Sequence, residues 1–213
     1  MGTGEWIVIG LCIVLAAWFL VGSYLNEQKS QQISRWTREG LRNYGTLGAL
    51  RRLDPSSIGM KLMTEAKKPP FPQLEVLINL VRRENFPLWL YQQISHKRDL
   101  LIIKANLDSL PKFETHVLLK NDTAMLEKLN AADNRPLMLR AEIGDHCLYY
   151  RGNLDENTLS SVKSFTDHYA DCIQRLSLQA KAPHLTLSAY VTPLTSQLSE
   201  VFFQDLSNFS CKD

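Results

Sequence analysis

Histidine and cysteine side chains occur in two pairs that could bind a metal ion. His168 and Cys172 are four residues apart, which places both on one face of a helix, and His146 directly precedes Cys147. Four such side chains can complete a tetrahedral zinc site. Neither pair has zinc-finger spacing, however, and a cysteine on an apolar helix stripe is more often a small core residue. We therefore expect no metal and no other cofactor.

An acid–base site is the second chemistry to weigh, because Asp167, His168 and Asp171 lie within five residues of one another. Such clusters on a helix are usually solvated surface pairs. The sequence has no Gly-x-Ser-x-Gly elbow, no glycine-rich phosphate loop and no Cys-x-x-Cys motif. These are the motifs that most often accompany nucleophilic, phosphoryl-transfer and redox catalysis. We predict no catalytic residue and a protein that is not an enzyme.

Two adjacent cations, Lys97 and Arg98, precede a predicted strand. They could contact phosphate or a local stretch of ribosomal RNA, or they could form a charged turn that protects a strand end. Residues 69–213 contain 15 basic and 17 acidic side chains, a net charge of −2. This balance argues against broad nucleic-acid binding, including DNA binding.

The elements that must position these residues follow from local patterns of apolar and turn-forming side chains. Hairpins separated by short helices favour an α+β fold, in which an antiparallel, hairpin-rich sheet packs with helices. Asp155 should cap the clearest helix, whose apolar stripe extends to Leu176. Strands are predicted over residues 74–81, 99–107, 112–120, 137–143, 146–151 and 185–191, and shorter helices after Asn85 and after Asp122 or Thr123.

A membrane-spanning helix is predicted to precede this domain. Residues 6–25 contain no charged side chain, and 20 helical residues span about 30 Å, the thickness of the hydrocarbon core. Trp6, Trp18 and Tyr24 are the expected anchoring aromatics. A cleaved signal peptide is the alternative, since Val21-Gly22-Ser23 resembles a cleavage site. Glu5 in place of a preceding cation, and the length of the apolar run, favour the anchor.

Lysine and arginine residues are found on only one side of this helix. None precedes it, whereas residues 26–68 contain nine against four acidic residues, a net charge of +5 in a chain of net charge +2. The N-terminus should therefore lie outside and the main domain in the cytoplasm, at the endoplasmic reticulum in a eukaryote or the plasma membrane in a prokaryote. Three cysteines in the domain, an odd number, fit a reducing compartment.

The basic segment has two interpretations: a collar that lies along the lipid surface, or a helix that continues the anchor and packs on the domain. Candidate contacts with the membrane surface or a partner are Lys29, Arg35, Trp36, Arg38, Arg42, Arg51, Arg52, Lys97 and Arg98.

A terminal amphipathic helix is predicted from Thr195 onward, with an apolar stripe of Leu198, Val201, Phe202, Leu206 and Phe209. Such a helix either docks on its own domain or binds in another protein's groove. The predicted divisions are the anchor (1–25), a basic juxtamembrane collar and linker (26–70), the cytoplasmic α+β domain (71–193) and the terminal helix (194–213).

Three short strings resemble those of calumin-type proteins, a family of coiled-coil-domain-containing single-pass proteins of the endoplasmic reticulum. They are Lys97-Arg98-Asp99-Leu100-Leu101, Ala141-Glu142-Ile143-Gly144-Asp145 and His168-Tyr169-Ala170-Asp171. The resemblance covers about residues 97–176 and implies a part in membrane-protein biogenesis beside the translocon and ribosome. This chain lacks the family's acidic region before the anchor and its basic coiled coil after the domain.

We therefore expect a single-pass membrane-anchored scaffold or biogenesis factor. Its cytoplasmic domain would bind protein partners during the insertion or chaperoning of membrane proteins. The expected partners are integral membrane proteins and, as further candidates, the translocon or the ribosome. The alternative is a membrane-tethered enzyme or small-ligand-binding domain whose site is assembled from scattered residues. A deep polar pocket would favour that alternative, and a filled core with one exposed basic or apolar face would favour the scaffold.

Overall fold

The computed structural model describes residues 2–48, 51–54, 56–63, 71–108, 110–111, 113–131, 136–152 and 155–210. Its helices are α1 (Thr3–Leu41), α2 (Phe86–Ile94), α3 (Thr123–Ala131), α4 (Glu156–His168), α5 (Val191–Thr195) and α6 (Ser199–Ser210). Its strands are β1 (Thr46–Leu47), β2 (Arg51–Asp54), β3 (Ser57–Met63), β4 (Gln73–Asn79), β5 (Leu100–Asn106), β6 (Phe113–Leu119), β7 (Met138–Ile143), β8 (His146–Gly152), β9 (Ile173–Leu178) and β10 (Leu185–Tyr190).

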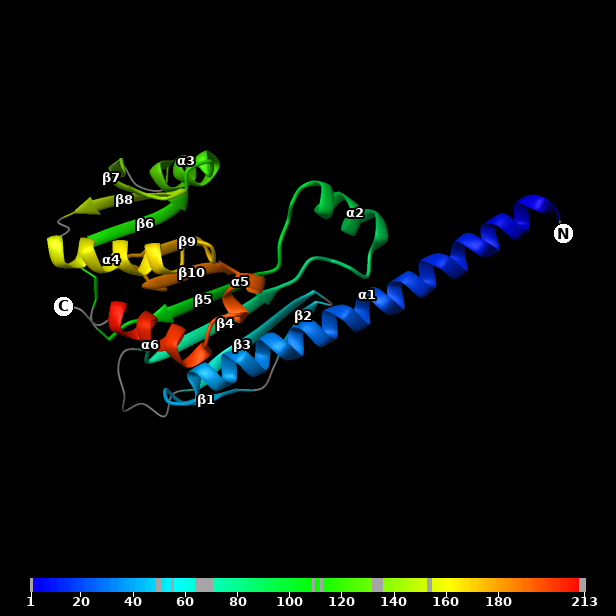
Figure 1. Ribbon diagram of the computed structural model, residues 1–213, viewed down its shortest axis with the longest axis horizontal. Helices are drawn as coiled ribbons and strands as arrows, with labels where there is room; N and C mark the ends of the chain where they lie inside the picture. Colours follow the sequence, from blue (N-terminus) through cyan, green and yellow to red (C-terminus); the bar gives the residue numbers. More distant parts are fainter. Residues whose placement is uncertain are drawn as a thin grey trace.

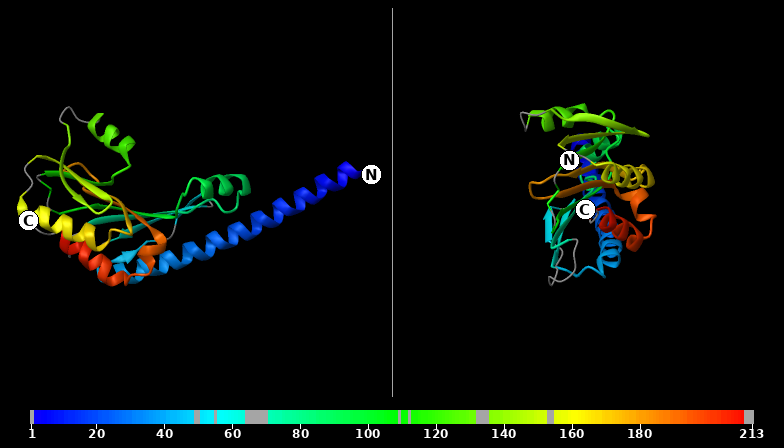
Figure 2. Two further views of the ribbon diagram at one scale, coloured as in Figure 1. Left: turned by 45° about the horizontal axis from the view of Figure 1, so that its top comes forward. Right: turned by 90° about the vertical axis from the view of Figure 1, so that its left-hand side faces the viewer.

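The predicted α+β class is confirmed. Ten strands form one sheet in the order β1-β3-β4-β5-β10-β9-β6-β8-β7, with β2 beside β3, and every pair is antiparallel (Figure 1). The second half of α1, α6 and α4 lie side by side over one face of this sheet (Figure 2). The other half of α1 extends away from the domain.

The core lies between these three helices and the sheet. In β4, β5 and β10, alternate residues are buried, as expected when one face of a strand packs against helices. The strand registers align these residues into a continuous apolar row across six strands, formed by Met60, Val76, Ile103, Leu187, Leu176 and Val117.

Helix α1 is one uninterrupted helix of 39 residues. Its N-terminal half is apolar and exposed, and the helix is long and apolar enough to cross a membrane. Its C-terminal half packs on the domain, which decides between the two interpretations of the basic segment. The buried stripe is made of small and polar residues with few large apolar ones: Gly22, Asn26, Ser30, Ile33, Ser34, Trp36, Thr37, Gly40 and Leu41.

Two predicted boundaries differ from the observed ones. The collar was separated from the domain near residue 70, but β3 on one side pairs with β4 on the other, so both belong to one sheet. The helix predicted to extend to Leu176 ends at His168, and Leu176 lies in β9. Leu176 and Leu178 alternate with Ser177, so a strand buries them equally well, and β9 fills the place between β6 and β10.

The terminal helix docks on its own domain. Phe202, Phe203 and Leu206 of α6 are fully buried, and Phe202 contacts both Trp36 of α1 and Phe165 of α4. The Phe209 side chain, which was part of the predicted stripe, and Cys211 lie outside the described residues. The helix is therefore part of the core.

Candidate functional site

A polar joint fastens α1 to the segment that connects β4 with α2. Trp18 Nε1 donates to the Arg83 carbonyl oxygen at 2.8 Å, and Asn26 Nδ2 donates to the Val81 carbonyl oxygen at 3.2 Å. Between them, a Cβ at Gly22 would overlap the Arg83 backbone. Residues 18, 22 and 26 are successive turns of one helix face. This face is therefore occupied by the chain itself.

Asp99, just before β5, is the charged centre of this joint and is only 5% exposed. Its carboxylate accepts from Lys29 Nζ at 2.7 Å, from Arg83 Nη2 at 2.8 Å and from the Val81 N–H at 2.7 Å. Burial alone would raise the pKa of Asp99, but the bonds from Arg83, Lys29 and Val81 outweigh it and lower this pKa. The ionised carboxylate thus holds one cation from the helix and one from the loop.

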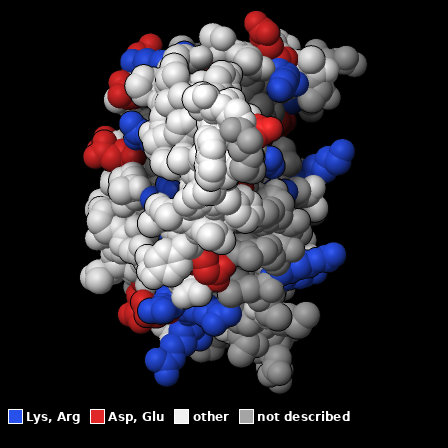
Figure 3. All heavy atoms as spheres, turned by 90° about the vertical axis from the view of Figure 1, so that its right-hand side faces the viewer, with Lys and Arg blue, Asp and Glu red and all other residues white. Residues whose placement is uncertain are grey.

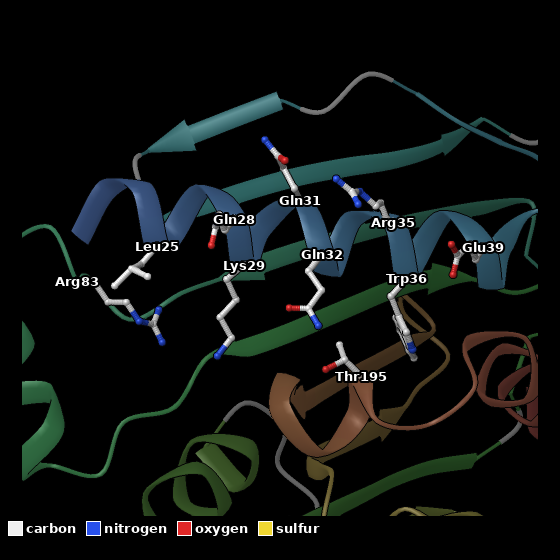
Figure 4. A pocket seen from close by; sticks show the side chains of 10 residues that line it. All are labelled: Leu25, Gln28, Lys29, Gln31, Gln32, Arg35, Trp36, Glu39, Arg83 and Thr195. Carbon is white, nitrogen blue, oxygen red and sulfur yellow. The ribbon is translucent and has the colours of Figure 1, made fainter. Parts of the chain in front are cut away.

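Two open depressions meet at these cations. The first, here called the helix groove, has a volume of about 820 Å³ and follows α1 toward α5 (Figure 4). In Figure 4, Lys29, Gln32 and Trp36 point to the side where Thr195 of α5 lies. The groove is lined by Leu25, Gln28, Lys29, Gln31, Gln32, Arg35, Trp36, Glu39, Arg83 and Thr195.

The second depression, here called the basic cleft, has a volume of about 700 Å³ and shares Lys29 and Arg83 with the helix groove. Four of its lining residues are cationic and two are acidic, so the cleft is electropositive. The Arg98 guanidinium lies 5.1 Å from the centre of the Tyr190 ring, within the range of a cation–π contact. Its lining residues are Lys29, Val81, Arg83, Gln93, Lys97, Arg98, Asp99, Asp171, Tyr190, Thr192, Pro193 and Ser196.

The predicted contact residues are divided by the fold. Lys29, Lys97 and Arg98 meet in the basic cleft, and Arg35 lies in the helix groove. Arg38, Arg42 and Arg51 are exposed but line neither depression, and the Arg52 side chain lies outside the described residues.

Trp36 is a core residue, although it was predicted to contact the membrane surface or a partner. Its indole N–H donates to the Gln197 carbonyl oxygen at 2.9 Å, and its ring packs on Phe202 and Phe203. It also lines the helix groove. Trp6 and Tyr24 are exposed on α1, whereas Trp18 packs against α2.

The histidine and cysteine pairs are not assembled into one site. His146 is buried with Nε2 2.8 Å from the Ile173 carbonyl oxygen, and Cys172 is buried in the core. Within the described ranges, no group of three or more His, Cys, Asp or Glu residues could hold a metal ion. The acid–base cluster is also dispersed, because Asp167, His168 and Asp171 line three different depressions.

One polar chain was not anticipated from the sequence. Ser177 Oγ lies 2.8 Å from His116 Nδ1, and Glu114 Oε1 lies 2.9 Å from His116 Nε2. Arg151 donates to the other Glu114 oxygen at 2.8 Å. The imidazole is only 1% exposed, and burial lowers the pKa of His116 despite the neighbouring carboxylate. With its imidazole closed to solvent, the chain ties β6, β8 and β9 together.

No protein-family model matches this chain, and no curated protein is significantly similar to it. The calumin-type resemblance therefore stays a prediction. What the geometry offers is an open, positively charged strip where α1 leaves the domain.

Proposed function

We propose that this chain is a single-pass membrane protein that holds a partner-binding α+β domain against the bilayer, as a scaffold or biogenesis factor without catalysis of its own. The observation that carries the proposal is the continuity of α1. One helix joins an uncovered apolar half to a half buried in the domain core. With no loop between them, the domain cannot swing freely on its anchor.

Retention of the N-terminal half, rather than its removal as a signal peptide, is supported by the joint. Cleavage after Ser23 would remove Trp18 and Gly22, which both contact the loop before α2. The excess of Lys and Arg after the span supports a cytoplasmic domain.

The partner-binding strip is proposed to be the helix groove together with the basic cleft. Both are open, and amide side chains lie beside the cations: Gln28, Gln31 and Gln32 in the groove and Gln93 in the cleft. Amides can bond a peptide backbone and cations can bind acidic side chains, so an acidic segment of a protein partner fits this lining. One end of the strip, at Leu25 and Arg83, lies where the apolar part of α1 ends. It is therefore suited to an integral membrane protein or, as the calumin-type resemblance implies, a translocon or ribosome component.

A topology reporter tests the first half of this proposal. A reporter fused after Asp213 should be active in the cytoplasm. A reading on the opposite side of the membrane would overturn the orientation.

Affinity capture from cells in mild detergent, with quantitative mass spectrometry, tests the second half. The double variant Lys97→Glu/Arg98→Glu should reduce the amount of captured membrane proteins by at least about tenfold. Reversing a charge at the rim of an interface slows association, and reversing a charge that is paired with the partner speeds dissociation. The double variant Lys128→Glu/Lys163→Glu is the matched control, because it also reverses two exposed charges but lies away from the strip. Equal recovery with both variants would refute the assigned strip.

A further inference from the structure

Helix α2 presents an apolar surface that the domain does not cover. None of its residues is buried, and Leu90, Tyr91 and Ile94 are 45%, 60% and 71% exposed. The helix is nonetheless well formed, since Asn85 Oδ1 caps it by accepting from the Leu88 N–H at 3.1 Å. An ordered helix with an apolar exposed face normally has something apolar against it.

The position of α2 along α1 indicates what covers that face. Trp18 of α1 packs on Phe86 and Trp89 of α2, with ring centres 5.0 Å apart in both pairs. Gly22, one turn later, is in contact with the Arg83 backbone. Helix α2 is therefore fixed beside the last two turns of the apolar segment.

The length of α1 before its first contact with α2 sets the depth at which α2 lies in the membrane. Residues 6–17, the part of the apolar span before the first contact with α2, extend about 18 Å at the rise of an α-helix. The hydrocarbon core is about 30 Å thick, so roughly 12 Å of the span is still needed when α1 reaches Trp18. A membrane that contains the whole span must therefore also contain the level of α2.

Positively charged side chains appear at the level where the membrane span should end. Lys29 lies seven residues beyond Gly22, about 10 Å further along the helix axis, and exposed Lys97 and Arg98 follow α2 directly. Figure 3 shows this end of the molecule, with uncharged groups along the middle and lysines and arginines, interspersed with acidic groups, toward the margins. Apolar side chains bordered by cations are the pattern of a helix in the interface of an anionic bilayer.

We infer that α2 is a second membrane anchor, whose exposed face lies in the acyl-chain and headgroup boundary of the leaflet that α1 leaves toward the domain. The occupant is the phospholipid bilayer itself. The inference rests on the proposed membrane span of α1 and deepens it. Two anchors joined at Trp18 and Gly22 place the basic cleft, directly behind α2, at headgroup level.

Depth-dependent fluorescence quenching tests this inference on the full chain in nanodiscs of phosphatidylcholine and phosphatidylserine. An environment-sensitive fluorophore is placed on one cysteine at a time: native Cys12 in the span, Ile94→Cys on α2, or Leu198→Cys, which is 74% exposed at the start of α6. Cys12 and Cys211 are replaced by serine where not labelled, and Cys147 and Cys172 are buried. Acyl-chain-brominated lipid and aqueous iodide are the quenchers.

We expect brominated lipid to quench the labels at positions 12 and 94. Iodide should quench these two labels at least about fivefold less than the label at position 198, because acyl chains exclude the ion. A quenched Cys12 label with an Ile94 label as iodide-accessible as that at Leu198 would overturn the second anchor alone. An Ile94 label protected from both quenchers would also overturn it, because a protein surface would then cover α2. An iodide-accessible Cys12 label would overturn the span and the inference together.

Discussion

The two halves of α1 meet different surroundings with different residues. Residues 6–17 of the first half are apolar all round, their side chains are exposed, and a Cβ at Gly10 would touch nothing. The second half is buried through glycine, serine, threonine and asparagine together with Ile33, Trp36 and Leu41, and the side chains of Asn26, Ser34 and Thr37 are hydrogen-bonded within the fold. Hydrophobicity therefore marks the part of this helix that the domain leaves open, while small size and satisfied hydrogen bonds mark the part that it packs against.

The largest effect should come from a charge in the first half. Val14→Asp should disfavour membrane insertion by about 3–4 kcal/mol, the usual cost of replacing an apolar residue by aspartate at the centre of a span. Gln32→Asp, exposed in the second half, should leave insertion unchanged. The fraction of protein that resists alkaline extraction from membranes measures both. Full retention of Val14→Asp would mean that the first half does not span the bilayer.

The next effect should come from the joint. Asp99→Asn should lower the free energy of unfolding by about 2–3 kcal/mol, because it leaves Lys29 and Arg83 together without their buried counter-charge. Chemical denaturation followed by tryptophan fluorescence in nanodiscs measures the loss. Glu142→Gln is the control, since it removes one partner of an exposed ion pair with Lys120 and should have no measurable effect. Equal effects would show that the joint does not hold α1.

The pH dependence of the free energy of unfolding should also report on the joint around Asp99. Because folding lowers the pKa of Asp99 from 3.8, its contribution is complete above this value and is lost as the pH falls below it. Folding also lowers the pKa of His116 from 6.5, so stability already begins to fall as the pH drops below 6.5, where the unfolded imidazole binds a proton that the folded one does not. Asp99→Asn should flatten only the lower step and His116→Gln only the upper one.

A smaller effect is expected from the glycines. Gly40→Leu would place a side chain against Phe203 and the Ser199 carbonyl oxygen, and Gly22→Leu would displace the Arg83 backbone. Each should destabilise the domain by about 1–2 kcal/mol, as overpacking usually does. Gly10→Leu is the matched control, with the same gain in helix propensity and open space around it. Thermal unfolding in nanodiscs compares the three, and a control as destabilised as the others would contradict the close packing.

Strong local patterns were predictable. Asn85 and Asp155 are the caps that they were expected to be, each accepting a bond from the backbone N–H three residues later. The hairpin across Gly144 and the strand at β6, where Phe113, Thr115, Val117 and Leu119 alternate with other residues, were also recognised, because capping, turn geometry and alternation act between neighbours in the chain. The early strands β1 to β3 were missed. Their residues lie in a basic segment, and most of their pairing partners are distant in sequence.

By itself, the sequence determined that there is one helix apolar enough for a membrane, a one-sided distribution of cations after it, and an α+β domain. These properties depend on composition and short-range periodicity. Only the tertiary structure decided that α1 continues into the core and that Trp36 is buried. It also brought Lys29, Arg83 and Asp99 together from three elements and left the apolar face of α2 open. Those outcomes depend on contacts between residues up to 167 positions apart, as in the packing of Trp36 on Phe203, and no local pattern encodes them.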